Sequence, residues 1–199
     1  MPLKWALVRG LTFGAIVLVA VASGGCKPAA STDKAFKTIR IYDLLVAVPD
    51  ATPRVHNPSF MSVGEHAVAG EARHALFLHP AGSVEFPLVR LSSRAELCFW
   101  IGIDSGVWDK AGDGVEFSVF VSRANDARTK IFSRYLDPKH NPDDRRWVEG
   151  RVSLRAFRDQ DVRITLATEP GPANDVAFDW ALWAEPQIML HDDMQPGSE

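Results

Sequence analysis

Hydrophobic and polar residues alternate with a period of two in the stretch from Glu96 to Ser122. The first run, residues 97–103, reads LCFWIGI, and the second, residues 115–121, reads VEFSVFV. β-branched and aromatic residues fill both runs, and this period is typical of strands that bury one face. A polar loop that contains two aspartates, residues 105–114, joins them. The pattern predicts two strands at the centre of an antiparallel β-sandwich.

Further apolar runs lie on both sides of this stretch. They cover residues 75–78, 84–89, 131–136, 147–157, 162–166 and 177–190. Turn-forming residues separate the runs at intervals of about 8–15 residues, as in all-β folds. An amphipathic helix of ordinary length is not evident among them. The sequence therefore predicts an all-β antiparallel sandwich or jelly roll over residues 73–190, and not an α/β fold.

The segment before residue 73 is more irregular. Residues 39–42 alternate, and the apolar run that continues to Val48 fits either a strand or a helix. Pro49, Pro53 and Pro58 then interrupt the pattern. We expect residues 38–72 to form an irregular or strand segment that packs on the sandwich. Residues 191–199 are predicted to form a flexible tail.

The N-terminal residues differ from the rest of the chain. Lys4 and Arg9 precede an uncharged apolar run at residues 11–22, and small residues lead from there to Cys26. This is the layout of a secretory signal peptide, and the run is short for a membrane-spanning helix. An ordinary secreted protein cut nearby and an uncleaved anchor are the alternatives.

Residues 21–26, VASGGC, resemble the lipobox of bacterial lipoproteins, with Ser23 in place of the usual leucine. The resemblance implies removal of a signal peptide of residues 1–25 and lipidation of Cys26 by acyl chains such as palmitate. Residues 26–37 then form the lipidated end and a polar tether. In such lipoproteins, Lys27 after the cysteine implies sorting to the outer membrane. We therefore expect a lipid-anchored protein of the bacterial outer membrane or cell envelope.

Composition and cysteine usage agree with this expectation. The chain is 46% hydrophobic and 24% charged, which is ordinary for a globular protein. Its net charge of −3 argues against a nucleic-acid partner, because nucleic-acid binders usually carry a basic face. If Cys26 carries lipid, Cys98 has no disulfide partner, and we expect it to be a small buried apolar side chain. The alternative is a Cys26–Cys98 disulfide in an oxidising compartment.

Several short motifs follow one another in a fixed order in the second half of the chain. They are DGV at residues 113–115, Trp147 ahead of VSL at residues 152–154, and D-x-A-x-W-x-x-P at residues 179–186. Their order resembles that of galactose-binding-like jelly-roll domains, close to the NPCBM-type carbohydrate-binding modules, over residues 73–190. The resemblance implies a jelly-roll fold and carbohydrate binding without catalysis.

The chain departs from that family pattern at two places. Val152 replaces the usual aspartate, which removes any polar role at that position. Asp159 and Gln160 stand where relatives often have glycine after the strand. Aspartate tolerates the left-handed backbone conformation better than most residues, so a turn there remains feasible.

Motifs of catalysis are missing from the sequence. It contains no G-x-S-x-G, no phosphate-cradling glycine-rich loop and no H-E-x-x-H. Its six histidines are scattered along the chain, which does not favour a zinc site. We predict that the protein is not an enzyme. Paired carboxylates for glycoside hydrolysis stay open, because such a pair forms in space and not in sequence.

Loop aromatics and charged loop residues are the candidate sugar ligands. Sugars stack their apolar C–H faces on aromatic rings, and binding residues concentrate on loops. The candidates are Trp108, Asp109, Asp113, Arg145, Arg146, Trp147 and Asp179. Packing at the start of a strand is the alternative interpretation for Trp147, and turn formation is the alternative for Asp109 and Asp113. The resemblance alone suggests that Asp179 pairs with Arg145 or Arg146.

A structural calcium ion is a weaker hypothesis, and we expect no other cofactor. Its candidate ligands are Asp104, Asp109, Asp113 and Glu185, whose spacing matches no EF-hand. Glycan binding at the cell envelope is the first functional hypothesis. The alternative is an envelope protein-interaction or assembly module without sugar affinity, and an uncharacterised hydrolase comes third. The expected partners are the membrane, through the lipid anchor, and a polysaccharide or an envelope protein.

Overall fold

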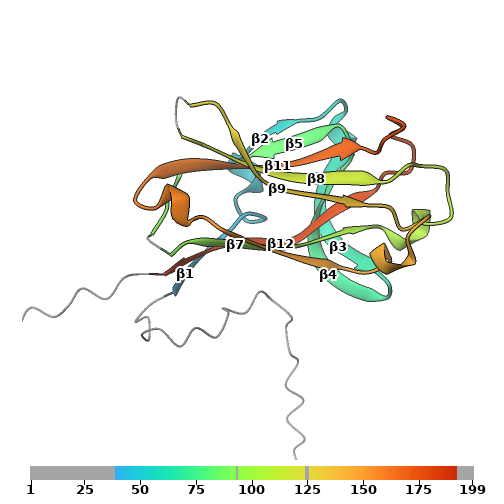
Figure 1. Ribbon diagram of the computed structural model, residues 1–199, viewed down its shortest axis with the longest axis horizontal. Helices are drawn as coiled ribbons and strands as arrows, with labels where there is room; N and C mark the ends of the chain where they lie inside the picture. The colour runs from blue at the N-terminus through green and yellow to red at the C-terminus, as the bar shows by residue number, and fades with distance from the viewer. Residues whose placement is uncertain (1–38, 93, 124–125, 192–199) are drawn as a thin grey trace, which may run out of the picture.

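Two antiparallel sheets lie face to face in the computed structural model, which describes residues 39–92, 94–123 and 126–191 (Figure 1). Each sheet has six strands, and the described residues contain 3-10 turns but no α-helix. The prediction of an all-β antiparallel sandwich is confirmed. None of the described residues belongs to a helix that is long and apolar enough to cross a bilayer. The predictions about the signal peptide, the tether and the tail at residues 192–199 lie outside the described residues.

Sheet A has the strand order β10-β7-β12-β4-β3, and β1 pairs with the second half of β12. Its strands are β1 (Ile39–Asp43), β3 (Met61–Val68), β4 (Glu71–Leu78), β7 (Glu96–Ile103), β10 (Val148–Ser153) and β12 (Ala181–His191).

Sheet B has the strand order β2-β5-β11-β8-β9, and β6 pairs with the start of β11. Its strands are β2 (Thr52–Arg54), β5 (Gly82–Glu85), β6 (Val89–Arg90), β8 (Val115–Arg123), β9 (Thr129–Leu136) and β11 (Asp161–Pro170). The 3-10 turns are η1 (Val48–Asp50), η2 (Pro58–Phe60), η3 (Ser105–Val107), η4 (Pro142–Asp144) and η5 (Arg155–Phe157).

The core lies between the sheets, and the two strongest apolar runs face each other across it. β7 belongs to sheet A and β8 to sheet B, and the inward residues of both are fully buried. Trp183 of β12 fills the centre, with its ring 5.1 Å from that of Phe99 and 5.4 Å from that of Phe117. Both pairs are edge-to-face, an arrangement that adds to the stabilisation from burial. The alternation in sequence therefore identified the buried faces correctly.

The segment before residue 73 is part of both sheets. β1 and β3 are hydrogen-bonded into sheet A and β2 into sheet B, so no structural boundary falls at residue 73. β3 pairs with β4 along its whole length, through a two-residue turn at Ala69 and Gly70. Both turn residues have positive φ, at 53° and 80°, as the favoured hairpin turns require. The apolar pattern of β3 is weak, so the sequence alone does not identify it as a strand. Its backbone pairing with β4 holds it in the sheet.

Two backbone irregularities have local causes in the sequence, and the first of them was expected. Asp159 adopts the left-handed conformation at φ 59°, so the turn forms without glycine. In β12 the register shifts between Ala184 and Gln187, where Pro186 cannot donate a hydrogen bond to the ladder. Glu185 takes φ 48° in this bulge, and its carboxylate lies 3.0 Å from the Arg73 guanidinium.

Cys98 is fully buried on the outer face of sheet A. Its Sγ lies 3.8 Å from the sulfur of Met189. We expect Cys98→Ala to lower the free energy of unfolding by about 1–2 kcal/mol, because it removes packed volume. Urea denaturation of the two proteins measures this difference. Equal midpoints, or failure of the unfolded wild type to react with a thiol reagent, would contradict the interpretation.

Candidate functional site

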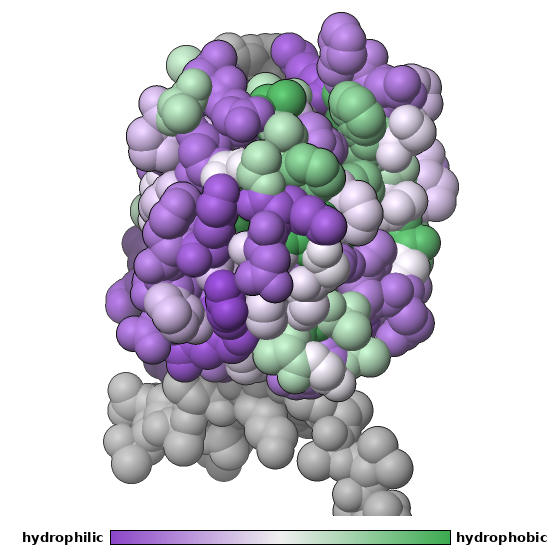
Figure 2. Space-filling model, turned by 90° about the vertical axis from the view of Figure 1, so that its right-hand side faces the viewer, coloured by the Kyte–Doolittle hydropathy of each residue, from purple (hydrophilic) through white to green (hydrophobic). Residues whose placement is uncertain are grey.

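Three loops meet at one end of the sandwich, on the right in Figure 1. They connect β7 to β8, β9 to β10, and β11 to β12. They meet because the first residue of β8, Val115, pairs with the last residues of both β9 and β11, Leu136 and Pro170. Figure 2 shows this end face-on, with apolar patches exposed among mostly hydrophilic side chains.

Trp108 is fixed in the first of these loops. Asp104 caps η3 by accepting a hydrogen bond from the Gly106 backbone at 2.8 Å, and the Trp108 indole N–H donates to the Ile103 carbonyl, also at 2.8 Å. The ring is half-buried and packs on the core. The Arg145 guanidinium lies 5.7 Å from the ring centroid. Trp108 is therefore a rigid wall of the loop and not a freely exposed platform.

Asp113 ties its own loop to the β11–β12 loop and to the end of β9. Its carboxylate accepts a hydrogen bond from the Ala173 backbone N–H, and its carbonyl accepts one from the Tyr135 hydroxyl. Gly114 follows at φ 82°, a conformation that favours glycine. A Cβ on Gly114 would lie 2.7 Å from the Tyr135 hydroxyl. The DGV motif is thus explained by the turn, in agreement with the turn interpretation of Asp113.

A small pocket opens between these loops. Ile103, Val107 and Trp108 supply its apolar side. Lys110, Asp137, Lys139 and Asp179 supply its charged groups, and the exposed ring of Phe178 stands at its edge. The pocket thus combines an apolar surface with hydrogen-bond donors and acceptors. Small-molecule sites combine the same two kinds of surface but are usually larger than this hollow, whose empty volume is about 250 Å³ with the open solvent included.

Phe178 was not identified by sequence reasoning. The alternation of Val176, Phe178 and Trp180 suggests a strand, but β12 begins only at Ala181. Phe178 has φ 62°, and 43% of its surface is exposed at the edge of the pocket. A sequence signal for this loop does exist. Gly171 and Pro172 end the preceding strand, and the apolar residues that follow them lie in a loop before β12 begins.

Asp179 is buried to 2% exposure and forms no ion pair with the two arginines. Its Oδ2 atom has no hydrogen-bond partner among the described residues. Burial, reinforced by the charges of Asp113, Asp175 and Asp137, raises the pKa of Asp179 to about 7. The expected pairing with Arg145 or Arg146 is therefore wrong, since loop geometry directs both guanidinium groups elsewhere.

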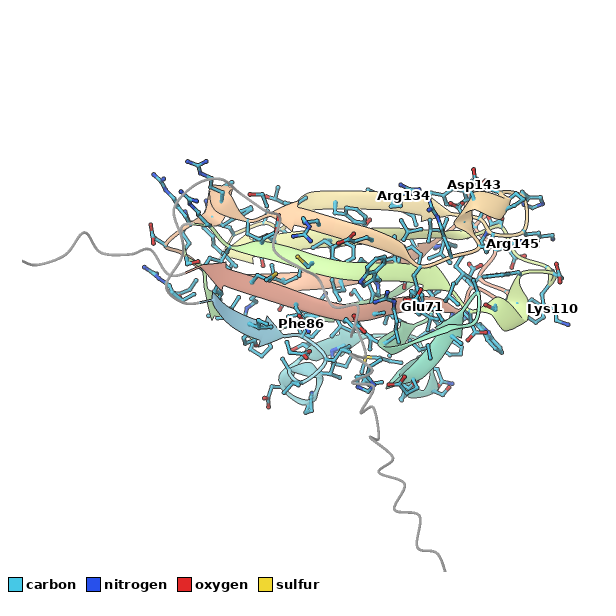
Figure 3. All side chains as sticks on the ribbon, turned by 90° about the horizontal axis from the view of Figure 1, so that it is seen from below. Glu71, Phe86, Lys110, Arg134, Asp143 and Arg145 are labelled. Carbon is cyan, nitrogen blue, oxygen red and sulfur yellow. The ribbon has the colours of Figure 1, made fainter. Side chains whose placement is uncertain are left out.

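Arg145 and Arg146 belong to the β9–β10 loop and brace it. Nε of Arg145 donates to the Pro138 carbonyl at 2.7 Å, and its Nη2 lies 3.6 Å from the carboxylate of Asp109. Nε of Arg146 donates to the Asp143 carbonyl at 3.0 Å. Asp109 itself is 94% exposed, so this ion pair is held only weakly. Figure 3 shows Lys110, Asp143 and Arg145 at this same end of the molecule, well away from Phe86.

Tyr135 and His140 complete the polar surroundings of Asp137. The Tyr135 hydroxyl lies 3.4 Å from the Asp137 carboxylate, and Nδ1 of His140 lies 2.8 Å from it. Burial and the charges of Asp137 and Asp113 raise the pKa of Tyr135 to about 12. Tyr135 therefore remains a protonated hydrogen-bond donor at neutral pH.

Trp147 is not available to a ligand. It is 5% exposed, its indole N–H donates to the Glu71 carbonyl at 2.9 Å, and its ring covers Gly102. A Cβ on Gly102 would lie 3.1 Å from the ring, so the glycine makes room for the tryptophan. Trp147 is therefore a packing residue, as the alternative interpretation stated, and the prediction that it contacts a sugar is wrong.

The weak calcium candidates do not converge on one site. Asp104 caps η3, Asp109 pairs with Arg145, and Glu185 pairs with Arg73. Asp113 binds the Ala173 backbone in the loop tie. In the described ranges, no group of three or more histidine, cysteine or acidic residues is placed to hold a metal ion.

Comparison with known proteins gives a limited set of likenesses. No known protein-family profile matches the sequence. An uncharacterised protein of Archaeoglobus fulgidus is 34% identical over 152 residues, which cover 73% of this chain and 38% of the relative. The chain thus spans well under half the length of the curated relative that it matches.

Several solved structures share the β-sandwich architecture, and carbohydrate-binding modules are among them. The CBM51 module of Clostridium perfringens GH95, in complex with methyl-galactose, is 13% identical, with a TM-score of 0.45 over 78% of this chain and 94% of that chain. The xylan-binding module CBM15 is 9% identical, with a TM-score of 0.45 over 79% and 99%. The K1 adhesin domain of Lys-gingipain from Porphyromonas gingivalis is 12% identical, with a TM-score of 0.49 over 78% and 99%. These likenesses extend to the architecture alone.

Proposed function

We propose that this domain is a non-catalytic glycan-binding module that holds a sugar in the pocket at the loop end of the sandwich. The observation that carries the proposal is the composition of that pocket. An exposed aromatic ring, Phe178, stands at its edge, and charged groups of both signs line the rest. The rigid β-sheets behind the loops hold these groups in place, as a binding site requires.

The chemistry of the lining suits a sugar. The apolar C–H face of a pyranose packs on an aromatic ring, and Phe178 offers a substantially exposed ring at the edge of the pocket. Lys110 and Lys139 can donate hydrogen bonds to ring and hydroxyl oxygens, while Asp137 can accept from hydroxyls.

Replacing Phe178 with alanine is expected to weaken sugar binding about tenfold, since an aromatic contact of this kind contributes roughly 1–1.5 kcal/mol. Stability should change little, because the ring is substantially exposed. A glycan array on the full chain in mild detergent identifies the sugar, and titration calorimetry then compares the variants. Leu88→Ala is the matched control, as Leu88 is also 43% exposed and does not line the pocket. Equal loss of affinity in both variants would count against the site.

A protein-interaction module is the second candidate, and one observation favours it. Val176, Phe178 and Trp180 are all more than 40% exposed within five residues of the β11–β12 loop. Such an apolar loop can seat a protein partner as readily as a sugar. Two results together would favour this alternative and contradict the glycan-binding proposal. Cross-linking in cells would retrieve a specific envelope protein, and the protein would bind no glycan on the array.

We also propose that the domain is held at the cell envelope by lipid on Cys26. The support is the lipobox-like sequence VASGGC ahead of a polar tether. Cys26→Ser is expected to move the protein from the membrane fraction to the soluble fraction, because stable anchoring needs the acyl chains. Fractionation followed by immunoblotting measures this. A variant that stays in the membrane fraction after carbonate washing would refute the lipid anchor.

A further inference from the structure

Two carboxylate oxygens beside the pocket lack hydrogen-bond partners. Oδ2 of Asp179 and Oδ1 of Asp113 are buried, and neither has a partner among the described residues. Burying a carboxylate without a donor is costly, and buried polar groups in folded proteins are nearly always bonded. An acceptor left open beside a pocket is therefore a place where a bound molecule can supply the missing donor.

The pocket reaches Asp179 because a glycine stands beside it. Gly112 has φ 141°, and a Cβ there would lie 3.5 Å from Oδ1 of Asp179 and 2.8 Å from the Ala177 carbonyl. A side chain at this position would come between the Asp179 carboxylate and the pocket, so the glycine keeps the pocket wall close to that carboxylate. Gly112 and Asp179 both line the pocket, although they are far apart in sequence.

Charges around Asp179 restrict what can bind. Asp113, Asp137 and Asp175 lie close enough to act on it electrostatically, and none of the causes that shift its pKa is a lysine, although Lys110 and Lys139 also line the pocket. A ligand that carried its own carboxylate would bring a further negative charge against this acidic side, and like charges repel strongly in a poorly solvated site. A neutral ligand with hydroxyl groups meets no such penalty.

We infer that Asp179 is the hydrogen-bond acceptor that determines specificity in this pocket, and that the ligand is a neutral sugar which donates a hydroxyl to it. The inference rests on the proposed glycan-binding function and specifies its ligand class. A site that accepts a hydrogen bond from a substrate hydroxyl discriminates sharply against analogues without it, because its polar group is then left unpaired. Uronic acids are expected to be rejected.

Binding should also depend on pH. A hydroxyl donates more strongly to an ionised carboxylate than to a neutral acid. Because burial raises the pKa of Asp179 to about 7, the ionised fraction rises steeply between pH 6 and pH 8. Affinity should therefore increase over this range, by about tenfold at most. The titratable and charged groups around Asp179 are Asp113, Asp137, Asp175, Tyr135, Lys110 and Lys139, with His140 bonded to Asp137.

Calorimetry on the full chain in mild detergent tests the inference with matched pairs of probes. The neutral probes are methyl galactoside and methyl glucoside, and the charged ones are galacturonic and glucuronic acid. We expect wild type to bind a neutral probe at least tenfold more tightly than its uronic acid. Asp179→Asn should lose at least tenfold in affinity at pH 8 and should bind equally at pH 6 and pH 8. His140→Asn should keep the pH dependence.

The controls separate this inference from the proposed function. Asp161→Asn, an exposed carboxylate paired with Arg90 outside the pocket, should bind as wild type does. If wild type binds no probe and no glycan on the array, the proposed function fails. If wild type binds a neutral sugar and Asp179→Asn binds it equally well at both pH values, only the inference fails. Tight binding of the uronic acids, or of calcium alone in an Asp179-dependent manner, would also overturn it.

Discussion

Asp179→Asn is expected to stabilise the ligand-free protein by about 4 kcal/mol at pH 8 and to have little effect near pH 4. Burial and three neighbouring carboxylates raise the pKa of Asp179 from its ordinary 3.8 to about 7. The fold therefore favours the protonated acid. Stability from this group is fully present below pH 3.8 and is lost as the pH rises to 7, at about 1.4 kcal/mol per unit. The asparagine is neutral throughout and avoids this loss.

Urea denaturation of wild type and variant at pH 4, 6 and 8 measures the effect. The difference between the two proteins should grow with pH and level off above about pH 7.5. Asp161→Asn provides the control, because surface ion pairs contribute about 0–1 kcal/mol and this one is exposed. A constant difference across the pH range would show that Asp179 does not ionise within it. A variant that is less stable at pH 8 would show that the ionised carboxylate has a donor in the fold.

Stabilisation of this variant together with its loss of sugar binding would be informative. Functional sites often retain groups that destabilise the free protein, because the ligand later satisfies them. Asp179 would then cost stability in the free protein and be satisfied by the ligand. Both measurements use Asp179→Asn, so together they test whether the same carboxylate lowers stability in the free protein and contributes to sugar binding.

Gly171→Ala is expected to lower the free energy of unfolding by about 2–3 kcal/mol, through overpacking against backbone. A Cβ on Gly171 would fall closer than 3.0 Å to the carbonyl oxygen of Asp113. Backbone cannot move aside as a flexible side chain can, so the β11–β12 loop must shift. That shift would break the hydrogen bond from Ala173 to Asp113 and displace Phe178 and Asp179 from the pocket.

Gly64→Ala is the matched control for this prediction. Gly64 lies in β3 and has nothing within 4 Å of the position that its Cβ would take. We expect the free energy of unfolding of Gly64→Ala to stay within about 0.5 kcal/mol of the wild-type value, as is usual for surface substitutions. Thermal denaturation compares the two variants. If Gly171→Ala and Gly64→Ala have the same melting temperature, the packing of the β11–β12 loop on Asp113 is looser than the structure indicates.

The sequence by itself determined which strand faces are buried. Residues 97–103 and 115–121 alternate, and a strand with one face in the core must place alternate side chains there. The inward residues of both runs are buried. The left-handed turn at Asp159 followed in the same way from local backbone preference. These features are local, so a single stretch of chain contains the necessary information.

Only the tertiary structure decided how the site is composed. Asp113, Asp137 and Asp179 belong to three loops, and strand pairings between distant segments bring them together. The exposure of Phe178 and the burial of Trp147 depend on neighbours that no local pattern names. β3 was missed for the same reason, because its pairing with β4 and not its own apolar pattern defines it. Alternation reports burial along one strand, whereas a pocket depends on which loops share an end of the sandwich.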